Sequence, residues 1–63
     1  MNVTAYRLYH EYLTAAWRAV ATSRRYRQAG DRHHAALWAN VARFDRVAAT
    51  NVAKRAALIA GNA

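Results

Sequence analysis

One tripeptide near the middle of the chain, Ala29-Gly30-Asp31, interrupts an otherwise continuous helical pattern. The 63 residues contain no proline and only two glycines, so this is the one strong break. Glycine adopts the left-handed conformation that ends a helix, and aspartate caps the start of the next one. The sequence therefore predicts an all-α protein with a single domain, a two-helix antiparallel hairpin with helices over residues 4–28 and 32–60 and a turn at 29–31.

The predicted ends of the two helices carry capping residues. Asn2 or Thr4 is expected to cap the first helix, because a side-chain oxygen there accepts a hydrogen bond from a free backbone N–H. Gly61 is expected to end the second helix.

Each predicted helix has an apolar face that spans about half of its circumference at 100° per residue. A helix packed on one neighbour needs a narrower stripe, and a chain this short without cysteine has few other routes to stability. We therefore expect a homodimer, an antiparallel four-helix bundle. Alanines of the second helix would allow close approach, with Tyr and Trp rings of the first helix filling the volume opposite. The expected oligomer core is Tyr9, Leu13, Trp17, Val20, Leu37, Val41, Phe44 and Val52.

Positive charge is concentrated at the turn and along the polar face of the second helix, in a chain of net charge +7. Such a surface is typical of proteins that bind polyanions, because the arginine guanidinium forms paired hydrogen bonds with phosphate oxygens and stacks on bases. Two aromatic residues near the turn are placed to stack on an unpaired base. The residues expected to contact nucleic acid or an acidic partner are Arg24, Arg25, Arg27, Arg32, Arg43, Arg46, Lys54, Tyr26 and Trp38.

Three interpretations of this basic surface stay open. The leading one is a nucleic-acid-associated regulator that contacts phosphates. The second is an adaptor or inhibitor, bacterial or phage, that docks on an acidic protein surface. The third is a solvated basic face in an arginine-biased proteome, without a partner. A helix-turn-helix reader of duplex sequence is not expected, because it needs a third helix and shorter elements.

Enzymatic activity is not expected, and neither is a small-molecule substrate. The only carboxylates are Glu11, Asp31 and Asp45. Asp31 is explained as a helix cap, and the other two do not form a pair on one face. There is no cysteine nucleophile and no glycine-rich phosphate loop.

Two histidine sites invite a metal hypothesis, His10 in the first helix and His33-His34 in the second. Within one hairpin these sites lie roughly 24 Å apart along the axis, so they do not share an ion. An antiparallel dimer would bring them closer, but adjacent residues of a helix point about 100° apart. We therefore expect no metal and no other cofactor.

No basic leader with an apolar run stands at the N-terminus, and no stretch of 18 apolar residues occurs. The expected location is cytoplasmic. Binding to a membrane surface is not expected, because the apolar faces consist of Ala and Tyr rather than Leu and Phe.

The segment YRQAGDRHHAALWA, from Tyr26 to Ala39, resembles a stretch of small uncharacterised actinobacterial helical proteins. The shared features are an aspartate–arginine step, paired histidines and a Leu-Trp-Ala run. The resemblance covers about a quarter of the chain. It implies a helix start after the turn and a high-GC bacterial or phage source, and it assigns no function and no site residue.

Overall fold

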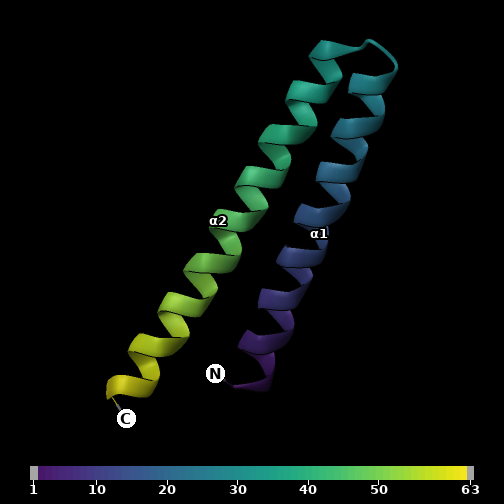
Figure 1. Ribbon diagram of the computed structural model, residues 1–63. Helices are drawn as coiled ribbons and strands as arrows, with labels where there is room; N and C mark the ends of the chain where they lie inside the picture. The colour runs from purple at the N-terminus through teal and green to yellow at the C-terminus, as the bar shows by residue number, and fades with distance from the viewer. Residues whose placement is uncertain (1, 63) are drawn as a thin grey trace.

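The computed structural model describes residues 2–62, which form two antiparallel helices joined by a short turn (Figure 1). Helix α1 runs over Val3–Gln28 and helix α2 over Arg32–Asn62. The hairpin is a thin rod, 51 Å in its longest dimension. The predicted all-α hairpin is confirmed, with α1 starting one residue earlier and α2 ending two residues later than expected.

The first helix begins at a side-chain cap. Asn2 has an extended backbone, and its Oδ1 accepts a hydrogen bond of 2.7 Å from the backbone N–H of Ala5. This bond satisfies one of the free donors of the first turn. Of the two predicted caps, Asn2 therefore fills the role, and Thr4 lies inside the helix.

The turn combines two capping motifs within three residues. Gly30 has a φ of +81°, and its N–H donates to the carbonyl of Arg27 at 3.0 Å. The N–H of Asp31 donates to the carbonyl of Tyr26 at 2.9 Å, which completes the paired bonds of a Schellman motif. Asp31 then caps α2, since its Oδ1 accepts from the backbone N–H of His34 at 3.0 Å. Both sequence-based roles, for Gly30 and for Asp31, are confirmed.

The prediction that Gly61 ends the second helix is wrong. Gly61 lies inside α2, which continues to Asn62. A glycine cap turns the chain out of a helix through a positive φ, and among the described residues only Gly30 has one. A glycine in the last turn costs only about 1 kcal/mol relative to alanine, so the helix continues through it.

Small side chains form the seam between the helices. The buried residues are Ala16, Ala19 and Ser23 of α1 and Ala35, Ala42 and Ala49 of α2. Each has a relative exposure of 4% or less, and among the described residues no large side chain is fully buried. The predicted close approach of the alanines is confirmed. Within the hairpin, the buried residues of α1 at this seam are two alanines and a serine, and half-buried Tyr12 lies beside Ala48. That aromatic rings fill the remaining volume of a four-helix bundle stays a prediction.

A side-chain hydrogen bond crosses this seam. The Ser23 hydroxyl donates to the carbonyl oxygen of Ala35 at 2.7 Å. The bond lies close to the turn, where the helices run side by side, whereas they diverge toward the termini in Figure 1. Ser23 therefore joins the beginning of α2 to the end of α1.

Candidate nucleic-acid interface

Four arginines from the two helices line one groove, which we call the arginine groove. Ser23 and Ala42, both buried, lie at its floor. Its full lining is Val20, Ser23, Arg24 and Arg27 of α1 with Ala39, Ala42, Arg43 and Arg46 of α2. The helical spacing explains the arrangement, because residues three apart are neighbours on a helix surface. Each helix therefore contributes one arginine pair, and the alanine seam brings the two pairs together.

The charge of this groove is uncompensated within the hairpin. All four arginines are exposed, and none of the lining residues is acidic. Within residues 2–62 the one ion pair joins His34 to Asp31 in the turn. Four guanidinium groups around one hollow repel one another, and an anion bound between them relieves this repulsion.

An exposed tryptophan adjoins the arginine groove. Trp17 has a relative exposure of 72% and lines a second hollow with Leu13, Ala16, Val20 and Arg46. Val20 and Arg46 also line the arginine groove, so the two hollows are adjacent. Sequence reasoning assigned Trp17 to the core, whereas in the hairpin its ring lies open beside the arginines. We call this hollow the tryptophan hollow.

A third hollow extends the basic surface along α2 to Lys54. It is lined by residues of α2 alone, namely Arg43, Arg46, Val47, Thr50, Asn51 and Lys54. Arg46 therefore lines all three hollows and lies at their junction.

Other residues predicted to bind lie elsewhere. Arg25 and Arg32 are exposed but do not line the arginine groove. Tyr26 does not line it either, and its ring stacks on that of His34 with centroids 5.0 Å apart and an interplanar angle of 24°. Trp38 is 37% exposed and lies outside all three hollows. Sequence reasoning thus found the charges of the groove but not the aromatic residue beside it.

The residues predicted as oligomer core lie on two different sides of the hairpin. Leu13, Trp17 and Val20 line the tryptophan hollow on one side of the alanine seam. On the other side, α2 carries an outer row of apolar residues, Leu37, Val41, Phe44, Ala48, Val52 and Ile59. Tyr9, Leu13 and Val20 are half-buried, while Trp17 and Phe44 are 72% and 75% exposed. Within a single hairpin, Trp17 and Phe44 are not buried. Their burial by a second copy of the chain stays a prediction.

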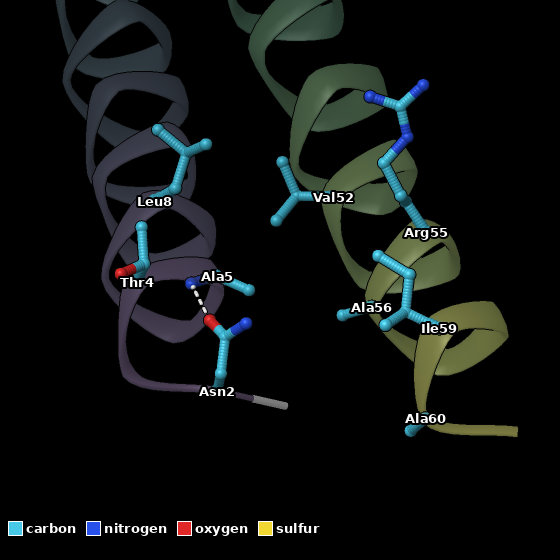
Figure 2. A pocket seen from close by; sticks show the side chains of 9 residues that line it. All are labelled: Asn2, Thr4, Ala5, Leu8, Val52, Arg55, Ala56, Ile59 and Ala60. Atoms are coloured by element: carbon cyan, nitrogen blue, oxygen red, sulfur yellow. Dashed lines mark hydrogen bonds between the residues drawn. The ribbon is translucent and has the colours of Figure 1, made fainter. Parts of the chain in front are cut away.

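An apolar cleft opens between the helices where they diverge near the termini (Figure 2). In Figure 2, Leu8 of α1 lies across from Val52 of α2, with Ala56 and Ile59 farther along. Val52 and Arg55 also line a shallow hollow with Ala48 and Tyr12. By helical spacing, the α2 residues of these hollows lie on the side of the seam opposite Arg43 and Arg46, and Arg55 is the one charged residue among them.

The histidines take part in local contacts. His34 Nδ1 donates to Asp31 Oδ2 at 2.7 Å, and the His10 ring packs edge-on against Tyr6 with centroids 4.4 Å apart. The backbone hydrogen bond from His34 lowers the pKa of the Asp31 carboxyl below 3.8, and the His34 ring and the charge of His33 lower it further. Within residues 2–62 no three His, Asp or Glu side chains come close enough together to hold a metal ion.

The two helices are also unsuited to crossing a bilayer. In the part of the chain that the structure describes, neither helix has a stretch that is both long and apolar enough to span a membrane.

Comparison with models of protein families, with curated proteins and with solved structures gives no match to this chain.

Proposed function

We propose that this protein is a nucleic-acid-associated regulator, which acts by binding phosphates in the arginine groove and not by turnover. One observation carries the proposal. Arg24 and Arg27 of α1 meet Arg43 and Arg46 of α2 around a single groove that no acidic residue lines. Arginine is suited to this task, because its planar guanidinium binds phosphate oxygens in pairs and stays charged at any physiological pH.

Trp17 supports a preference for unpaired strands. Its exposed ring lies next to Arg46, so a strand with phosphates in the groove would place a base against the indole. Stacking of a base on an aromatic ring is worth about 1–3 kcal/mol and tolerates any sequence. We therefore assign the stacking role to Trp17 in place of Tyr26 and Trp38, and expect single-stranded RNA or DNA to bind more tightly than duplex.

Fluorescence anisotropy with short labelled oligonucleotides tests the proposal, with the dissociation constant measured over a series of salt concentrations. If the four arginines each neutralise one phosphate, log K falls against log salt with a slope of about −2.8 for a single strand. Changing Arg43 and Arg46 together to Gln should halve that slope and weaken binding to every sequence.

The matched control changes Arg7 and Arg18 to Gln, which removes the same charge from exposed positions of α1 outside the groove. We expect this control to keep the salt slope of the unchanged protein. Equal losses in the two double variants would show that binding follows net charge alone, and the groove would then have no special role. Trp17→Ala should weaken binding of single strands and leave duplex binding nearly unchanged.

The second interpretation, an adaptor that docks on an acidic protein, is distinguished by capture from cells with and without nuclease. Nucleic acid recovered with the protein, and lost together with other proteins after nuclease, supports the regulator. A protein partner that survives nuclease and is lost in the Arg43/Arg46 variant would overturn it in favour of the adaptor.

A further inference from the structure

The outer row of α2 is an apolar surface that its own hairpin covers only in part, since Ala48 and Val52 are half-buried and the other members are exposed. Leu37, Phe44 and Ile59 are 47%, 75% and 63% exposed. Among the described residues, those fully buried at the seam between α1 and α2 are alanines and Ser23. A hairpin with so small a core is marginal alone, and burial of the outer row would stabilise it.

The outer row is nearly symmetric about Ala48. Phe44 and Val52 lie four residues before and after it, and Leu37 and Ile59 lie eleven residues before and after it. When two copies of α2 pair antiparallel, each residue faces the one at the same distance on the other side of the centre. Phe44 then faces Val52, Leu37 faces Ile59, and the two Ala48 residues meet where the helices cross.

We propose that this protein self-associates through the outer row, as an antiparallel α2–α2 pair with its two-fold axis at Ala48. The small residue at the centre lets the backbones approach, while larger side chains fill the space on either side. The row extends over 22 residue steps, which gives a contact about 33 Å long. A self-complementary surface of this kind is what a two-fold dimer requires.

The charges of Asp45 and Arg55 favour the same antiparallel register of the two α2 helices. Asp45 flanks the outer row, and Arg55 lies within it, seven residues beyond Ala48. Among the described residues neither forms an ion pair inside the hairpin. In the proposed dimer, Arg55 of the second copy lies opposite Val41, only about 6 Å along the axis from Asp45. The long arginine side chain spans this distance, so both copies gain an ion pair.

This dimer leaves the arginine groove open, because the outer row lies on the other side of the hairpin. Self-association and nucleic-acid binding can therefore succeed or fail independently of each other.

Cysteine cross-linking tests the register directly, since the natural chain has no cysteine. Under mild oxidation, Ala48→Cys should form a disulfide-linked dimer. An equal mixture of Val41→Cys and Arg55→Cys should cross-link as well, while neither variant does so alone, because like positions lie far apart in the pair. Arg18→Cys, on the exposed back of α1, is the matched control and should stay monomeric on a non-reducing gel.

Sedimentation of the unchanged protein and of Phe44→Asp provides the second measurement. We expect a dimer for the former and a dissociation constant at least about 100-fold higher for the latter, because the dimer would bury an unpaired charge. A monomer at high micromolar concentration would overturn the proposal. A dimer that Leu13→Cys cross-links and Ala48→Cys does not would place the interface on the other side of the hairpin and overturn it too.

Discussion

Helix α2 carries two apolar rows that differ in side-chain size, in spacing and in burial. The inner row, Ala35, Ala42 and Ala49, repeats every seven residues and is 1–4% exposed. The outer row contains Leu37 and Ile59, with Ala48 eleven residues from each, and the two large residues are 47% and 63% exposed. A seven-residue repeat keeps its side chains against one neighbouring helix over many turns. The close fit of small side chains between the helices, and not the hydrophobicity of those side chains, therefore decides which of the two rows packs against α1.

This difference gives the two rows separate tasks. The inner row sets how closely α1 and α2 pack and how they are rotated about their axes, and the arginine groove depends on both. In the outer row Ala48 and Val52 are half-buried beside α1, whereas Leu37, Phe44 and Ile59 are exposed and free to contact another molecule. Substitutions in the inner row should therefore change the stability of the hairpin itself, while those in the outer row should change its association.

The largest effect is expected from enlarging an inner-row residue. Ala49 is 1% exposed, so Ala49→Leu would force the helices apart and lower the free energy of unfolding by about 1–3 kcal/mol. For a chain of this size each kilocalorie lowers Tm by about 4–8 °C. Thermal unfolding followed by circular dichroism measures the change, with Ala36→Leu at an exposed position of α2 as the control. A Tm for Ala49→Leu as high as that of Ala36→Leu would contradict the assignment of the inner row.

The hairpin itself was predictable from the sequence because its determinants are local. Gly30 ends α1 and Asp31 starts α2 through bonds within a few residues, and the absence of proline leaves both helices unbroken. Gly61 was misjudged for the same reason. A local signal indicated a cap, but the chain makes no left-handed turn at that position.

The composition of the seam and the site was less predictable because both depend on how the helices rotate against each other. The 100° period placed Trp17 and Phe44 on broad apolar faces but did not show which part of each face meets the other helix, although the seven-residue spacing of Ala35, Ala42 and Ala49 is visible in the sequence. With the seam known, the convergence of Arg24 with Arg43 follows from helical geometry. Without knowledge of the seam, the sequence shows only that Arg24 and Arg43 are basic residues on two separate helices.

A smaller effect is expected from the hydrogen bond that ties the start of the inner row to α1. Ser23→Ala removes the 2.7 Å bond to the carbonyl of Ala35 and should lower the free energy of unfolding by about 0.5–1.5 kcal/mol. Thr22→Ala is the matched control, because the Thr22 hydroxyl donates to Arg18 within its own helix. Chemical unfolding of both variants compares a bond between helices with one inside a helix. If Thr22→Ala lowers the free energy of unfolding as much as Ser23→Ala does, the bond across the seam stabilises the fold no more than a bond within one helix.

The smallest effect is expected from acid, acting on the cap that sets where α2 and its two rows begin. Because the pKa of Asp31 is lowered in the folded chain, the carboxylate stabilises the fold at pH values above 3.8, its ordinary pKa. As the pH falls below that value, the unfolded chain takes up the proton first, so this contribution is lost in acid. Asp31→Asn keeps a capping oxygen that does not titrate. The loss of helical signal between pH 5 and pH 2 should therefore be smaller in Asp31→Asn than in the unchanged protein. Identical acid curves would mean that the ionised cap adds nothing beyond the hydrogen bond that asparagine also accepts.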